Sequence, residues 1–127
     1  MHKQLPATLA SVRAARQAVR RFAAGLDVDL DGIALAVSEA VANAVAHGYT
    51  DEFPGTVELT ATASPREVTV TVRDRGRGLA APTGTPGAGY GLQLVRRLAQ
   101  RTELAEAPGG GVQLTMAFRR GVRWSSV

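Results

Sequence analysis

Cysteine is missing from this chain of 127 residues, which excludes disulfides, thiolate zinc sites and cysteine nucleophiles. The sequence also has no apolar run near the roughly 18 residues that would suggest a membrane span. Its first residues lack the uninterrupted apolar core of a signal peptide. These absences predict a soluble cytoplasmic protein with no membrane partner. The length suits one domain, residues 1–127, that folds without a disulfide or a metal.

Lysine is scarce as well, because Lys3 is the single lysine beside fourteen arginines. The net charge of +4 favours an acidic partner or a polyphosphate ligand. The arginines are scattered and the six aromatic residues show no stacking pattern, so we expect no direct nucleic-acid binding. Arg13, Arg20 and Arg21 lie largely off the apolar stripe of the first predicted helix. They form either a solvated basic face, which we favour, or a docking surface for an acidic partner.

Hydrophobic spacing divides the chain into helices and strands. It predicts helices at 8–25, 30–48 and about 90–101, and Asp29 or Asp31 can cap the second of them. Alternation predicts a hairpin of strands at 56–63 and 67–74, a short strand in "TELAEA" and a final strand in "GVQLTMAFRR", before a frayed tail at about 120–127. This order predicts an α+β two-layer sandwich, with a mixed, mostly antiparallel sheet covered on one face by three helices.

Three polar side chains recur at intervals of four in the alanine- and valine-rich segment "SEAVANAVAHGY". Glu39, Asn43 and His47 therefore form one stripe of the predicted helix, since residues four apart differ by about 40° around the axis. A solvent-facing stripe is the ordinary interpretation. Downstream, "DRGRG" follows a predicted strand and "GAGYGL" opens a predicted helix. Taken singly, these are typical of a tight turn and of a flexible loop; the three motifs in this order are the specific signal.

With these motifs the sequence resembles the GHKL ATPase superfamily, which has the Bergerat ATP-binding fold, and within it the anti-sigma factor branch of serine-protein kinases. "EAVANAVAHGY" resembles the N-box of that branch, "DRGRG" its first glycine box and "GAGYGLQLVRRLA" its second. The resemblance runs from about Leu5 to Phe118. It implies an ATP-binding serine/threonine-protein kinase, with ATP and Mg²⁺ as cofactors, that acts as an anti-sigma factor. The implied partners are a sigma factor and an anti-anti-sigma antagonist that is phosphorylated, and the resemblance also admits a homodimer.

The nucleotide would be held without a lysine. No G-x-x-x-x-G-K-[ST] segment occurs, which together with the position of Lys3 excludes a Walker-A site and a kinase-type strand lysine. Mg²⁺ keeps several waters, so the side-chain oxygen of Asn43 is a sensible single protein ligand, and the resemblance assigns it that role. Asp74 can accept a hydrogen bond from the amino group of adenine. Guanine has a carbonyl at that position and cannot donate such a bond. The nucleotide-binding set implied by the resemblance is Asn43, His47, Asp74, Gly76, Gly78, Gly87, Gly89, Gly91 and Leu92.

Glu39 lies one turn before Asn43, where a carboxylate can orient or deprotonate an attacking hydroxyl, so we expect it to be the catalytic residue. His47 either extends the site or serves the helix C-terminus, where a histidine is favoured. Val112 departs from the resemblance, because the superfamily usually has a threonine there that helps to hold adenine. Thr115 lies at an odd offset from Val112 and therefore faces the other side of the strand.

Three further functions stay open at this stage. A non-catalytic module could use ATP only to switch a protein-binding surface, and replacing Glu39 would distinguish it from a kinase. A sensor histidine kinase fragment would need a phosphoacceptor histidine, and His2 lies in a start that we expect to be disordered. A basic nucleic-acid binder would show salt-dependent binding.

Overall fold

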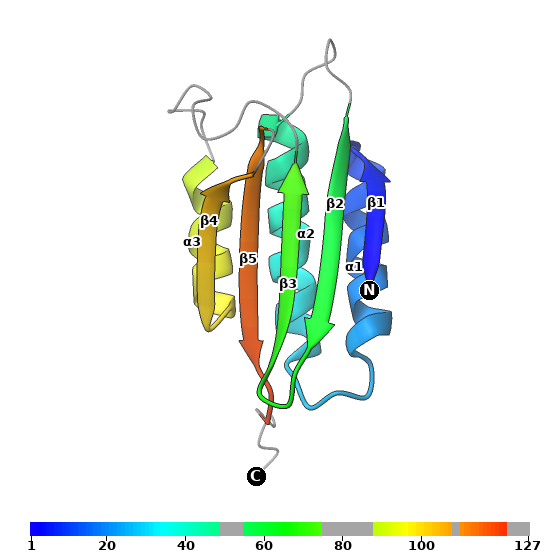
Figure 1. The fold of residues 1–127 in the computed structure, drawn as a ribbon, viewed down its shortest axis with the longest axis vertical. Coiled ribbons are helices and arrows are strands. Elements are labelled where there is room, and N and C mark those ends of the chain that lie inside the picture. The colour runs from blue at the N-terminus through cyan, green and yellow to red at the C-terminus, as the bar shows by residue number, and fades with distance from the viewer. Residues whose placement is uncertain (49–54, 75–87, 108–109, 122–127) are drawn as a thin grey trace.

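The computed structural model describes residues 1–48, 55–74, 88–107 and 110–121. The chain folds into β1 (His2–Pro6), α1 (Leu9–Ala23), α2 (Leu30–Gly48), β2 (Thr56–Ala63), β3 (Glu67–Asp74), α3 (Ala88–Leu98), β4 (Arg101–Glu106) and β5 (Val112–Arg119). Figure 1 shows two layers, with a sheet in front and α1, α2 and α3 side by side behind it. The α+β class expected from the sequence, with helices on one face of a sheet, is confirmed.

The sheet has the strand order β1-β2-β3-β5-β4. Each of the four neighbouring pairs is antiparallel, so the described strands contain no parallel pair and the sheet is not mixed in this part of the chain. The register places Val57 of β2 opposite Asp74 of β3, and Val72 of β3 opposite Leu114 of β5. A buried and a less buried residue alternate along β3, which is the period-two pattern of a strand with one covered face.

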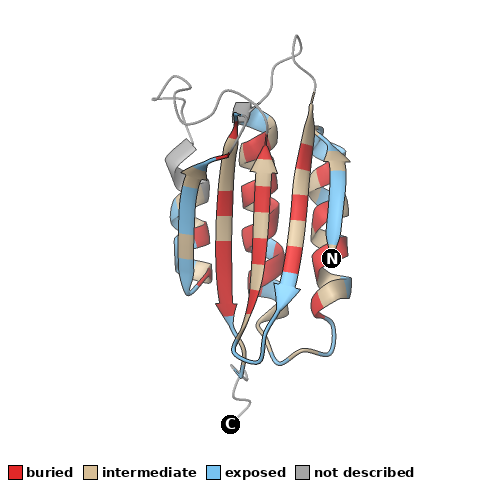
Figure 2. Cartoon of the chain, in the orientation of Figure 1, coloured by how far each residue is buried: buried red, intermediate tan, exposed pale blue. Residues whose placement is uncertain are grey.

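The core lies between the sheet and the helices. Helix α2 is buried over most of its surface because it contacts the sheet on one side and lies between α1 and α3, as Figure 2 shows in red. Its Ile33, Val37 and Val41 are fully buried, as are Leu59 of β2 and Val70 of β3. Fully burying such a side chain stabilises the fold by about 1.5–3 kcal/mol. Several of them together therefore outweigh the loss of any single polar contact at the surface.

Helix α2 begins with a cap that the sequence left open between two aspartates. The N–H of Gly32 donates to Oδ1 of Asp29 at 3.0 Å, so Asp29 is the capping residue. Asp31 instead accepts a hydrogen bond from Arg20 of α1 at 2.9 Å. A Cβ atom at position 32 would collide with the carboxylate of Asp29, which explains the glycine there.

The N-terminal segment corrects the prediction made from the sequence. Residues His2–Pro6 form the edge strand β1, paired from His2 opposite Thr60 to Pro6 opposite Thr56, where we expected disorder. Only Leu5 of this strand is partly buried, so no hydrophobic alternation announced it. The strand forms because its backbone pairs with β2, an interaction that side-chain patterning does not reveal. No helix in the described ranges is both long enough and apolar enough to span a membrane.

Candidate nucleotide-binding site

Four elements meet at one end of the sheet, where its central strands begin or end. Helix α2 and strand β3 run toward this end of the sheet and stop there, whereas α3 and β5 begin there and run away from it (Figure 1). The antiparallel pairing of β3 with β5 makes the end of one coincide with the start of the other. The described parts of the three motifs, on α2, at the end of β3 and in the first turns of α3, therefore lie at this end of the sheet although they are separated along the chain.

Asp74 ends β3 as a buried carboxylate. The alternation of β3 places it on the same face as Val68, Val70 and Val72, which is the face covered by helices, and it is 6% exposed. The backbone N–H of Val112 donates to Asp74 Oδ1 at 3.2 Å. A buried carboxylate needs such donors, because losing hydration without compensation is costly. Its two oxygens offer about four acceptor positions, which is the chemistry that recognition of a ligand N–H requires.

The contact between Asp74 and Val112 was missed by reasoning from the sequence, which considered only the side chain of Val112. A backbone donor leaves no mark in the residue type. The nearest signal is the glycine triplet that precedes β5. Gly110 and Gly111 have φ values of 105° and 90°, a conformation that glycine adopts readily and other residues avoid. They let the chain turn into β5 so that the Val112 N–H meets the carboxylate.

Asn43 lies on the last two turns of α2 and carries an unsatisfied group. Its side chain is partly buried, and the amide nitrogen is fully buried without a hydrogen-bond partner among the described residues. Leaving a buried donor unpaired costs about 1–3 kcal/mol. An asparagine held at such a cost fits a side chain that completes its contacts with a ligand. The unpaired N–H groups suit an acceptor such as a phosphate oxygen, and a metal ion would take the amide oxygen instead.

Glu39 and Asn43 share the less buried side of α2. Both are partly buried, whereas Ala40, Val41 and Ala44 are buried in the core. The neighbouring Ser38 is not available to the site, because its hydroxyl donates to the carbonyl oxygen of Ala34 at 2.8 Å within the helix. The stripe expected from the sequence therefore has the expected position on the helix for these two residues.

The remaining predicted site residues are placed less completely. Gly76, Gly78 and Gly87 and the side chain of His47 lie outside the described residues, and Gly89 and Gly91 are described only as part of the first turns of α3. Leu92 is partly buried and packs against the core. It also lines a small hollow with Thr102 of β4 and Leu114 of β5, so its described contacts hold α3 against the sheet.

A metal ion at this end of the sheet would be bound mainly by oxygen atoms of the bound phosphate compound and of water. Within the described ranges, no group of three or more His, Asp or Glu side chains could hold a metal ion. Mg²⁺ requires no such group when phosphate oxygens and water supply most of its ligands. The amide oxygen of Asn43 on α2 suits that mode of binding. One such ligand is too few for a metal site made of protein atoms alone.

A family model described as a histidine kinase-like ATPase domain matches residues 5–118. The chain belongs to this family. The resemblance of its three motifs to the GHKL superfamily, and to its anti-sigma factor branch, is thereby confirmed. The match runs from the end of β1 to Phe118, the last residue but one of β5, so it contains the ends of α2 and β3 and the starts of α3 and β5.

The chain is similar in sequence to several anti-sigma F factors. It is 33% identical over 116 residues to the anti-sigma F factor of Thermoanaerobacter sp. (strain X514), which covers 80% of each chain. The anti-sigma F factor of Anoxybacillus flavithermus is 39% identical over 82 residues, or 62% of this chain and 56% of that protein. The chain spans about half the length of several curated relatives that it matches.

A solved structure supports the same assignment. The structure of the RsbU and RsbW domains of Rv1364c from Mycobacterium tuberculosis matches with a TM-score of 0.73 and 28% identity. The match covers 99% of this chain and 34% of that longer one. The two-layer arrangement of this ATPase domain is thus shared with a solved protein over nearly its whole length.

Proposed function

We propose that this chain binds ATP with Mg²⁺ at the end of the sheet where α2, β3, α3 and β5 meet. We further propose that it is a serine/threonine-protein kinase that acts as an anti-sigma factor. The observation that carries the proposal is the pair formed by Asn43, with its unsatisfied buried amide, and Asp74, a buried carboxylate. They lie on α2 and β3, whose C-terminal ends meet at one end of the sheet in an ATPase-family domain. The names of the similar proteins support the anti-sigma role.

Asp74 would select adenine. One of its oxygens is held by the Val112 N–H, so the carboxylate is oriented before any ligand arrives. An oriented acceptor can take a hydrogen bond from the amino group of adenine, whereas guanine presents a carbonyl at that position. Preference for ATP over GTP follows from this single contact.

Asn43 and the start of α3 would hold the phosphates. A bound Mg²⁺ would neutralise charge on the phosphate oxygens, so that a hydroxyl could approach the terminal phosphorus. Asn43 would contribute the one protein oxygen to that ion. Gly89 and Gly91 lie in the first turns of α3, where free backbone N–H groups and the positive end of the helix dipole favour an anion.

Glu39 would be the catalytic base. It lies one turn from Asn43 on the same side of α2, so it can approach the terminal phosphate without binding the metal. Its carboxylate would accept the proton of a serine or threonine hydroxyl of the antagonist as that oxygen bonds to the terminal phosphorus and ADP leaves. The sigma factor and the antagonist are the partners that this function requires.

Calorimetry with ATP and GTP, with and without Mg²⁺, tests the binding site. We expect Mg²⁺-dependent binding of ATP that Asn43→Ala abolishes, with Gln17→Ala on the exposed face of α1 as a control that leaves binding unchanged. Equal binding of both nucleotides, or an unaffected Asn43→Ala variant, contradicts the proposed site.

Transfer of radiolabelled phosphate to candidate antagonist proteins tests the chemistry. Glu39→Gln should abolish transfer and keep ATP binding, whereas Glu103→Gln on the exposed strand β4 should keep both. If the wild-type protein binds ATP, transfers nothing to any candidate and behaves like Glu39→Gln, the domain is a non-catalytic module that ATP switches.

A further inference from the structure

A second surface feature lies at the end of the molecule opposite to the proposed nucleotide site. Helix α3 and strand β5 end there and α2 begins there (Figure 1). A groove at this end is lined by residues of α3 and β5 and of the segments next to α2 and α3. This groove, which we name the basic groove, has a volume of about 330 Å³. It is lined by Asp29, Arg97, Leu98, Gln100, Phe118 and Arg119.

Two arginine side chains of the basic groove have no partner within the part of the chain that the structure describes. Arg97 and Arg119 are exposed, and neither side chain forms an ion pair or a hydrogen bond with any described residue. The one acidic residue of the lining, Asp29, already accepts a hydrogen bond from Gly32 as the cap of α2. Asp29 keeps its negative charge, so the described lining carries two positive charges against one negative charge, and neither guanidinium group forms an ion pair with a described carboxylate.

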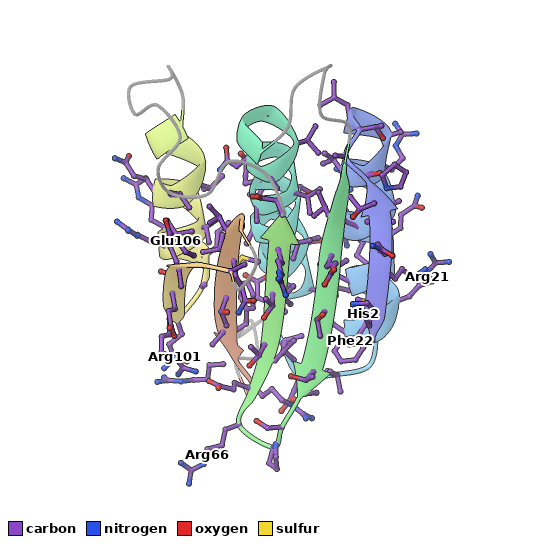
Figure 3. All side chains as sticks on the ribbon, turned by 45° about the horizontal axis from the view of Figure 1, so that its top comes forward. His2, Arg21, Phe22, Arg66, Arg101 and Glu106 are labelled. Atoms are coloured by element: carbon purple, nitrogen blue, oxygen red, sulfur yellow. The ribbon has the colours of Figure 1, made fainter. Side chains whose placement is uncertain are left out.

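The acidic residues around the basic groove are engaged by other arginines. Glu67 binds Arg101 through two hydrogen bonds of 2.9 and 3.4 Å, and this contact raises the pKa of Arg101. Asp27 accepts a hydrogen bond from Arg120 at 2.8 Å, which lowers the pKa of Asp27. Figure 3 shows Arg66 and Arg101 at the same end of the molecule, with Arg66 pointing away from the sheet. This end therefore carries an excess of positive charge that its own carboxylates do not balance.

The lining of the groove is also apolar between the charges. Leu98 is partly buried, and Phe118 is buried at 5% exposure. An apolar patch beside two guanidinium groups suits a ligand that combines carboxylates with an apolar side chain. It does not suit a single-stranded nucleic acid, because the one aromatic ring of the lining is too buried to stack on a base.

We propose that the basic groove binds an acidic segment of a partner protein, with its carboxylates on Arg97 and Arg119 and an apolar side chain against Leu98. Arginine suits this task because its planar guanidinium can bind a carboxylate through two parallel hydrogen bonds. The two charges also raise the rate of encounter with an acidic chain at low salt. This binding involves no residue of the nucleotide site, so it stands or falls independently of the proposed kinase function.

The test is a titration with a short fluorescein-labelled peptide of glutamate and leucine at low and at higher salt. The double variant Arg97→Gln/Arg119→Gln should bind it at least about tenfold more weakly, since each lost charge-assisted contact contributes substantially to affinity. The matched control is Arg13→Gln/Arg21→Gln, which removes two exposed arginines from α1 and should bind like the wild type. Circular dichroism and thermal unfolding check that both double variants are folded.

Comparison ligands separate the proposed occupant from other anions. The same peptide with glutamine in place of glutamate should lose binding, as should the peptide with serine in place of leucine. Amide shifts in nuclear magnetic resonance spectra should fall on Leu98, Gln100 and Arg119. The proposal is overturned if no peptide binding occurs, if both double variants lose binding equally, or if an RNA oligonucleotide or inorganic phosphate at equal concentration binds as tightly as the acidic peptide.

Discussion

At the scale of single residues, the site depends on a bond between a carboxylate and a backbone amide. Asp74 and Val112 lie 38 positions apart in sequence and are joined by one hydrogen bond of 3.2 Å. Asp74 therefore has two tasks, because it ties the end of β3 to the start of β5 and it would recognise the base. A substitution there should affect folding stability and nucleotide affinity together.

Asp74→Asn should weaken ATP binding and destabilise the fold. Hydrogen bonds to charged groups contribute about 1.5–3 kcal/mol, so we expect ATP affinity to fall about tenfold or more. The loss of the buried charge-assisted bond to Val112 should also lower the midpoint of chemical denaturation. Calorimetry and urea titration measure the two effects. Retained ATP affinity in a folded Asp74→Asn protein would remove Asp74 from the site.

Val112→Thr should strengthen ATP binding. The backbone N–H that holds Asp74 is unchanged by this substitution, while a hydroxyl is added at the start of β5 beside the carboxylate. One neutral hydrogen bond contributes about 0.5–1.5 kcal/mol, which corresponds to a gain of a few-fold up to about tenfold in affinity. Val45→Thr on the partly buried side of α2 is the control that should not gain affinity. An unchanged affinity of Val112→Thr would show that position 112 does not contact the nucleotide.

At the scale of elements, the start of α2 sets the helix that carries Glu39 and Asn43. Asp29→Ala removes the hydrogen bond to Gly32 and should cost about 1 kcal/mol of unfolding free energy. Asp31→Ala is the matched control, because the side chain of Asp31 is 88% exposed and its surface pair with Arg20 contributes little. Urea denaturation of the two variants gives the comparison, and equal losses would argue against capping by Asp29.

Gly32→Ala provides an independent check of the same contact. A Cβ at this position collides with the Asp29 carboxylate in the wild type, so the variant should be destabilised although alanine favours helices by up to about 1 kcal/mol over glycine. In the Asp29→Ala background the collision is absent, and the same substitution should become stabilising. A sign that does not change between the two backgrounds would contradict the geometry.

The elements were largely predictable from the sequence, and their edges show why. Helix α2 and strands β2 and β3 have the predicted bounds, because each repeats its apolar residues with a clear period. Strand β1 was missed because its pattern is polar and its pairing partners, from Thr60 opposite His2 to Thr56 opposite Pro6, are distant in the sequence. Helix α3 begins at Ala88 and ends at Leu98, a shift from the predicted 90–101 that follows from the poor helix signals of its glycine-rich start.

At the scale of the whole molecule, Arg120 joins three distant parts of the chain. It bonds Asp27 in the α1–α2 connection and the carbonyl oxygen of Ser64 in the β2–β3 turn, just after β5 ends. The hydrogen bond from Arg120 lowers the pKa of Asp27 below its ordinary value of 3.8. A carboxyl whose pKa is lower in the folded than in the unfolded protein stabilises the fold above the unfolded pKa. That stabilisation is lost as the pH falls below 3.8 through the folded pKa.

Asp27→Asn should therefore destabilise the protein at neutral pH and lose its effect in acid. We expect its thermal midpoint to lie below that of the wild type at pH 7 and the two midpoints to converge as the pH falls below 3.8. Glu106→Gln, at an exposed position of β4, serves as the control with no such convergence. A constant difference between Asp27→Asn and the wild type across this range would show that the pair with Arg120 does not titrate with folding.

The sequence by itself determined the local periods, the three motifs and hence the family, because apolar spacing and motif order are written along a single stretch of chain. The predicted roles of Asn43, Asp74 and Glu39 stay predictions, to be decided by the experiments above. Only the tertiary structure decided that the Val112 N–H meets Asp74 and that His2–Pro6 completes the sheet. It also decided that, among the described residues, the side chains of Arg101 and Arg120 have acidic partners whereas those of Arg97 and Arg119 do not. These features depend on which distant residues come together when the layers pack, and a one-dimensional pattern carries no record of that.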